Sequence, residues 1–265
     1  MTFLRAITFS TTFALLCISS VLVSAAEQTS SAPILGLVNA SQDRSQDHIL
    51  EFWGYHDYQG SQNYLDTLKL RYYNPLNLGD WHGTIRLDTA YTASYGPQQS
   101  AQATGTFSPN NAMLTIWGGQ AGWFGNIGAR IYAPLSNSGQ WLAGPQLSTS
   151  FKPTNSDKNI LADISPLARY MFGFSPKAPS GSSLPPLTSQ LELYPTIGLN
   201  LSPSTQIRFW DENGAVYNAA GGGWFVPIDA MVTQRINKNL LIAIGGAKQL
   251  VQTYQLYNWS IYGKI

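Results

Sequence analysis

The chain has 265 residues, and charged side chains make up only 11% of them, against roughly 25% in an average globular protein. Aromatic residues reach 12%, and the formal net charge is +1, a balance that does not suggest a nucleic acid or a strongly charged partner. The mean hydropathy of −0.10 does not exclude a membrane protein, because a barrel strand averages an apolar and a polar face.

Residues 1–26 are predicted to be an export signal. Arg5 provides the positive start, an apolar run extends to Val23, and small residues follow, with cleavage expected after Ala25 or Ala26. The only cysteine, Cys17, lies in this segment, so the mature chain is expected to have no disulfide and no Cys-based zinc site. No later stretch approaches the roughly 18 apolar residues of a spanning helix. A mature chain that spans a membrane would therefore do so as a closed barrel.

Residues 27–47 are rich in Ser, Gln and Asp, and we expect a flexible N-terminal periplasmic segment or a partial plug. A barrel domain is predicted for residues 48–265. Its first strand, 48–58, is aromatic, but Glu51 and Asp57 blur its alternation.

The clearest alternation is found in residues 81–95. Apolar side chains occupy its odd positions, with aromatics at both ends of that face, such as Trp81 and Tyr95. Its even positions are polar and include Arg86 and Asp88. Side chains alternate between the faces of a strand, so one face is apolar and the other is charged. A transmembrane barrel strand has such an apolar lipid face, edged by aromatics, and a polar lumen face.

Further stretches show comparable patterning and give a count of about twelve strands. After 48–58, the predicted strands are 63–75, 81–95, 106–119, 123–135, 140–152, 161–174, 188–201, 205–212, 223–236, 239–249 and 254–265. Most have about the 9–11 residues that cross a bilayer obliquely. The fold class is thus all-β, a transmembrane antiparallel up-and-down barrel.

The connections between these strands indicate an orientation. With both termini in the periplasm, compact turns fall inside and long loops fall outside, as in outer-membrane barrels. The inner turns are 76–80, 120–122, 202–204 and 237–238, and the outer loops are 96–105, 175–187 and 213–222. The pattern of 106–119 is weak, but without this strand the compact turns and long loops no longer separate to opposite ends, so the strand is retained. A barrel of ten strands is the alternative.

The C-terminal run Tyr257–Ile265 alternates apolar residues to the end of the chain. It resembles the terminal strand of bacterial outer-membrane β-barrels, which usually ends in Phe, whereas this chain ends in Ile265. The resemblance implies export to the outer membrane of a Gram-negative cell and recognition of Tyr257–Ile265 by the barrel-assembly machinery. Among smaller transporter-like barrels, the family grouped with phenol meta-pathway degradation proteins is considered, although no motif marks it.

Charged residues and one histidine gather on the predicted lumen faces, where a polar solute would need fixed charges to replace its hydration. These residues are Lys69, Arg71, His82, Arg86, Asp88, Arg130, Lys152, Asp163, Arg169, Glu192, Arg208, Asp229 and Arg235. They line either a porin-like solute pathway or a salt-bridge network that fills a narrow barrel. Because Arg outnumbers the acids, a mild preference for anions is a further hypothesis.

Aromatic residues near strand ends are interpreted as lipid-interface girdles rather than as a sugar-stacking platform. The predicted interface residues are Trp81, Tyr91, Tyr95, Trp123, Trp141, Trp224 and Trp259.

The enzyme interpretation has little support in the sequence. A lipid hydrolase needs a nucleophile and a base close together, and His56 with Asp57 could serve as base and orienter. No Ser lies in a G-x-S-x-G setting, and the three histidines lack metal-ligand spacing. No catalytic residue, metal or cofactor is predicted.

The sequence therefore favours a passive outer-membrane channel or transporter for small solutes. The alternatives are a secreted soluble β-sandwich or barrel that binds carbohydrate or protein, and a membrane-embedded lipid-modifying enzyme. A soluble protein would have to bury the apolar faces of 81–95 and 188–201, whereas a membrane barrel turns them outward.

Overall fold

The structure of the protein is a computed structural model, and it describes part of the chain. The described residues are 48–79, 81–96, 105–106, 113–122, 125–135, 139–153, 159–178, 180–181, 183–184, 186–254 and 256–265. The predicted signal 1–26 and the segment 27–47 lie outside them. The described residues contain no helix that is both long and apolar enough to cross a membrane.

These residues form β-strands in one antiparallel sheet. The strands are β1 (Ile49–Gly60), β2 (Asn63–Leu78), β3 (Trp81–Tyr95), β4 (Gly105–Thr106), β5 (Met113–Gly122), β6 (Gly125–Pro134), β7 (Gly139–Ser148), β8 (Leu161–Lys177), β9 (Ser189–Ser202), β10 (Thr205–Phe209), β11 (Ala215–Asn218), β12 (Trp224–Asn237), β13 (Leu240–Gln252) and β14 (Trp259–Lys264).

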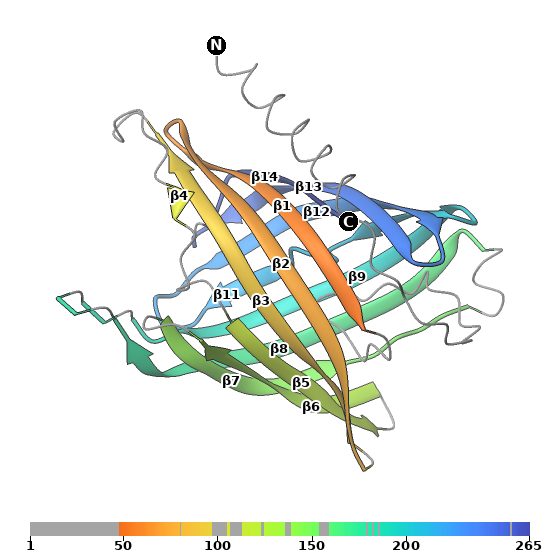
Figure 1. The fold of residues 1–265 in the computed structure, drawn as a ribbon, viewed down its shortest axis with the longest axis horizontal. Coiled ribbons are helices and arrows are strands. Elements are labelled where there is room, and N and C mark those ends of the chain that lie inside the picture. Colours follow the sequence, from red (N-terminus) through yellow and green to blue (C-terminus); the bar gives the residue numbers. More distant parts are fainter. Residues whose placement is uncertain are drawn as a thin grey trace.

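The strand pairings return to their starting point. From β1 they run through β2, β3 and β5 to β9, continue through β10 and β11 to β12, and reach β1 again through β13 and β14. The short β4 pairs with β3 alone, and β10 and β11 share one position between β9 and β12. The sheet therefore has twelve positions, as predicted, and the ten-strand alternative is wrong. Figure 1 shows β1 to β3 as a near wall that crosses in front of β8 and β9.

The alternation in β3 separates an inner and an outer face as predicted. Thr84, Arg86 and Asp88 are buried, whereas Leu87 between them is 43% exposed. Large apolar side chains are exposed in the same way on strands around the whole barrel. They include Phe52, Ile131, Leu147, Phe172, Ile228, Val232, Ile244 and Ile261. This outward apolar belt is the arrangement of a membrane barrel, and it contradicts the soluble alternative.

The two ends of the barrel differ broadly as the orientation argument requires. At the end that holds both chain ends of the barrel, β2 and β3, β5 and β6, β9 and β10, and β12 and β13 are each separated by two residues. At the other end the connections include 178–188 and 253–258. Two connections depart from this pattern: the long 149–160 lies at the first end, and the two-residue turn Ser61–Gln62 lies at the second.

Several strand bounds differ from the prediction. The weak strand 106–119 is found at Met113–Gly122, where it pairs with β3 and β6. The strand predicted at 140–152 ends at Ser148; beyond it only Phe151 makes an isolated bridge, to Ile164. The last strand begins at Trp259 rather than at 254.

The strand predicted at 205–212 is interrupted. β10 ends at Phe209, which pairs with Ile197 of β9, and β11 begins at Ala215, which pairs with Leu193. Five residues, 210–214, thus follow a path that β9 covers with three, and Trp210 has a positive φ of 50°. The segment 210–214 is called the strand break below.

The neighbouring strands are suited to this break. Pro195 of β9 and Pro227 of β12 face it, and proline has no amide N–H to leave unpaired. Substitute bonds hold the break in place: the Trp210 amide donates to the Asp229 carbonyl at 3.2 Å, and its indole donates to the Pro227 carbonyl at 3.0 Å. The Thr196 hydroxyl donates to the Trp210 carbonyl at 2.8 Å. The wall remains connected on both sides.

Candidate functional site

Most of the charged residues predicted for the lumen are buried on the inner face of the barrel. They are Arg71, Arg86, Asp88, Arg130, Asp163, Arg169, Glu192, Arg208 and Asp229. Lys69 and Arg235 are partly buried on the same strand faces. The prediction for Lys152 is wrong, because β7 ends before it and its side chain is exposed. The side chain of His82 lies outside the described part of the structure.

Some of these charges pair within one stretch of wall. Arg169 of β8 and Glu192 of the adjacent β9 form an ion pair, and the Tyr194 hydroxyl donates to Glu192 at 3.1 Å. Arg130 donates to the Gln146 side chain on β7 at 2.9 Å. Such contacts between neighbouring strands satisfy buried charges without crossing the lumen.

Arg208 connects β10 to the strand break and to β8. Its guanidinium donates to Asp163 at 3.0 and 3.2 Å and to Asp211 at 2.8 Å. All three side chains are buried. Asn213, further along the break, donates to the Asp229 carboxylate on β12 at 2.9 Å.

Glu212 reaches from the strand break to the far wall. Its carboxylate accepts hydrogen bonds from the Tyr55 hydroxyl at 2.7 Å and from Arg71 at 2.8 and 3.2 Å. Arg71 is on β2, five positions from the break in one direction around the barrel and seven in the other. Because the two sides lie nearly opposite each other, this contact bridges the lumen.

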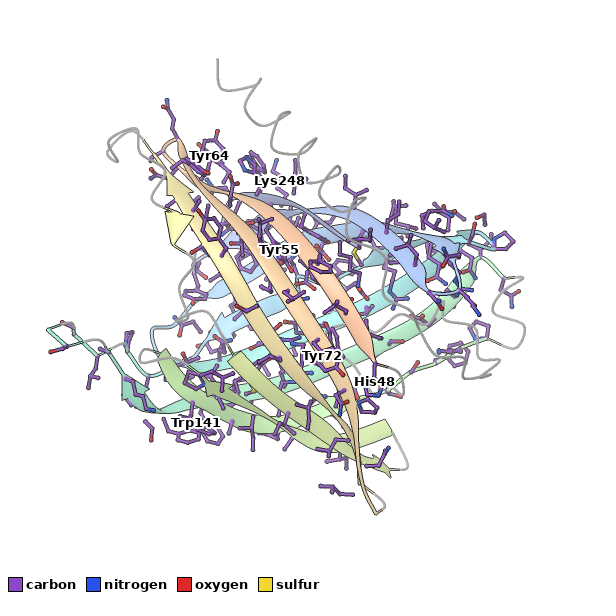
Figure 2. The ribbon with its side chains drawn as sticks, in the orientation of Figure 1. His48, Tyr55, Tyr64, Tyr72, Trp141 and Lys248 are labelled. Atoms are coloured by element: carbon purple, nitrogen blue, oxygen red, sulfur yellow. The ribbon has the colours of Figure 1, made fainter. Side chains whose placement is uncertain are left out.

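Aromatic rings and further charges surround Arg71. Its guanidinium carbon lies 4.6 Å from the centroid of the Trp53 ring, which stacks on Tyr55 at 5.6 Å. Its Nε lies 3.4 Å from Asp88, which also pairs with Arg86 at 2.7 Å. Tyr55 lies midway along the wall in Figure 2. The cross-lumen contact is therefore held within a packed cluster on the β1–β3 wall.

The sequence interpretation missed several inner-face residues. Glu51 of β1 pairs with Lys264 of β14 at 2.7 Å and accepts from the Trp53 indole at 2.8 Å. Glu51 shares its strand face with aromatics, so hydropathy did not mark that face as the polar one. The alternation of the last strand placed Lys264 opposite Trp259 and Ile261, and this signal could have identified it.

Five of the seven predicted interface aromatics lie towards the loop end of the barrel. Trp224 and Trp259 begin strands there, Trp141 lies near the start of β7, and Tyr91 and Tyr95 lie towards the end of β3. The rings of Tyr58 and Trp259 stack at 5.6 Å. The side chains of Trp81 and Trp123 lie outside the described part of the structure. Trp53, which was not among the predicted interface residues, is 1% exposed and lies on the inner face of β1.

The histidines do not form the expected pair of His56 with Asp57. His56 Nδ1 lies 2.5 Å from Asp66 on the outer face, whereas Asp57 alternates to the inner one. Asp66 is thus a hydrogen-bond partner of His56. His48 stacks on Tyr72, as Figure 2 shows. No group of three or more His, Cys, Asp or Glu side chains in the described ranges is placed to hold a metal ion.

Comparisons with known proteins bear on the fold. No family model matches the chain, and no curated protein matches it in sequence. A crystal structure of an outer membrane channel from Pseudomonas putida F1 is similar, with a TM-score of 0.55 and 11% sequence identity. The match covers 82% of this chain and 93% of the channel. The chain thus has the fold of an outer-membrane β-barrel.

Proposed function

We propose that the protein is an outer-membrane channel or transporter that admits small solutes through its charge-lined interior. The observation that carries the proposal is a closed circuit of strands with an apolar outer belt and a charged inner face. The similar solved structure, an outer membrane channel, supports the same role and the same membrane.

The inner face is suited to the passage of small polar solutes through a narrow lumen. Its charges come from both signs and from strands on all sides, so a passing solute meets hydrogen-bonding groups throughout. Many of these groups are paired and buried, and Glu212 crosses the lumen. The pathway proposed here is therefore a narrow one, in which solute contacts replace existing ion pairs.

Solute passage can be tested with the purified mature protein in liposomes. We expect swelling with small solutes and not with larger oligosaccharides, and ion conductance in planar bilayers. Liposomes that neither swell nor conduct, with protein shown to be inserted by heat-modifiable gel mobility, would contradict the proposal. Empty liposomes and an unrelated closed barrel serve as controls.

Targeting forms a second part of the proposal. Cleavage after Ala25 or Ala26 would release the mature chain in the periplasm, and β14 would present the assembly signal. β14 pairs with both β1 and β13, so it closes the barrel. Mass spectrometry of protein from outer-membrane fractions tests both statements; an uncleaved chain in the inner membrane would refute them.

A further inference from the structure

The strand break places a carboxylate of the chain in a cationic site on the opposite wall. Arg71 contacts both oxygens of Glu212, and the Tyr55 hydroxyl donates to one of them. Two-point contact between a guanidinium and a carboxylate is the geometry by which proteins recognise free carboxylates. Glu212 therefore shows which ligand chemistry this site accepts.

Three ion pairs lie at or beside the site, and Lys69 belongs to none of them. Glu51 pairs with Lys264, Asp88 with Arg86, and Glu212 with Arg71. Lys69 lies 4.8 Å from the Tyr55 ring and has no carboxylate within 4.0 Å among the described residues. Without Glu212, Arg71 would keep its 3.4 Å contact to Asp88, and Lys69 would keep the electrostatic attraction of Asp57 and Asp88 but no close ion pair. Buried charge without a close partner is costly, so an anion that takes the place of Glu212 would be stabilised there.

Glu212 is carried by a segment that lies outside the strand ladder. The strand break has five residues where β9 has three, and the ladder pairs of β10 and β11 lie on either side of it. Withdrawal of Glu212 would therefore leave those pairs intact. It would break the Arg71 and Tyr55 contacts and leave the anchors at Trp210 in place.

We infer that Tyr55, Lys69 and Arg71 form a binding site for small carboxylate solutes, and that Glu212 occupies it as a tethered ligand. The inference rests on the proposed function, because it names the class of solute that the lumen accepts. A solute carboxylate takes the place of Glu212 and removes the bridge across the lumen. A neutral solute of the same size cannot balance the positive charges of Lys69 and Arg71.

The first test compares acetate with its neutral isostere acetamide in planar bilayers. In the Glu212→Gln variant, the acetate concentration that half-blocks the chloride current is expected to fall about tenfold or more, because a charge-assisted competitor is lost. Acetamide should have no such effect. Asp66→Asn, which removes a carboxylate from the outer wall, should behave like the wild type. An unchanged acetate dependence in Glu212→Gln would overturn the inference.

The second test does not depend on conduction. Cys17 is the only cysteine, so a Cys17→Ser background with Glu212→Cys has a single thiol. We expect acetate, and not acetamide, to slow modification of that thiol by an anionic thiosulfonate, because both anions compete for Arg71. Adding Arg71→Gln should remove the protection, and equal protection by acetamide would count against the site.

The two tests separate this inference from the proposed function. Inserted protein that never conducts, in any variant, contradicts the channel, whereas acetate protection of the introduced thiol would still support the site. A conducting wild type without acetate protection contradicts the site and leaves the channel standing.

Discussion

The β2–β3 hairpin and the β10–β11 position build the same wall in different ways. β2 and β3 pair without a register shift from Tyr64↔Tyr95 to Leu78↔Trp81, and only their side chains enter the lumen. At the β10–β11 position the backbone itself leaves the ladder, and Glu212 crosses to the other wall. A continuous strand can line a lumen, but an interrupted strand can also bridge it.

Making the interrupted strand continuous should have the largest effect. Deletion of Asp211 and Glu212 leaves three residues where β9 has three, so β10 and β11 can join in register. We expect the bridge to vanish and the single-channel conductance in planar bilayers to rise. Deletion of Ala219 and Ala220, which shortens an end loop separated from the break by β11 and removes two backbone bonds to Ser189, serves as the control. Equal conductance in both deletions would show that the break does not restrict the lumen.

The anchor of the break should matter more to stability than a charge on the continuous wall. Arg208→Met leaves the buried Asp163 and Asp211 without their cation, at a cost of about 3–5 kcal/mol. In Arg86→Met, Asp88 keeps its contact with Arg71, so a smaller loss is expected. Urea unfolding in detergent micelles, followed by gel mobility, measures both. A larger loss in Arg86→Met would reverse the comparison.

The outer face of the continuous wall can be tested with a charge. Leu87 lies near the middle of β3 and is 43% exposed, so Leu87→Arg places a cation at the bilayer midplane and should cost about 2–4 kcal/mol. Leu78→Arg, at the barrel end, should cost about 0–1 kcal/mol. Folding into lipid vesicles measures the difference, and similar costs at both positions would argue against a lipid-facing β3.

A substitution at Gly214, where the strand break rejoins the ladder, should have a smaller effect on stability. A Cβ on Gly214 would lie 2.8 Å from the Tyr194 ring and closer still to the Leu193 carbonyl, so Gly214→Ala should cost about 1–3 kcal/mol. Gly246 of β13 has its nearest neighbour at 3.4 Å, and Gly246→Ala should be nearly neutral. Thermal mobility shifts on gels compare the two, and equal shifts would mean that the Gly214 site relaxes freely.

Sequence patterns predicted most of the strands and the two faces of most of them. Period-two alternation is a local property, so it identified β3 and β9 and placed Arg86, Asp88 and Glu192 on the inner face. The parity of turns and loops supported β5 although its own pattern was weak. The apolar outer face followed from the same alternation.

Which charges meet across the lumen depends on how the strands close into a barrel. Alternation placed Arg208 and Glu212 on one face of a strand at 205–212, but the extra residues of the break depend on how β9 and β12 pair around it. The contact of Glu212 with Arg71 joins residues 141 positions apart in the chain. Closure of the sheet brings them together, and no local pattern records which strand lies opposite another.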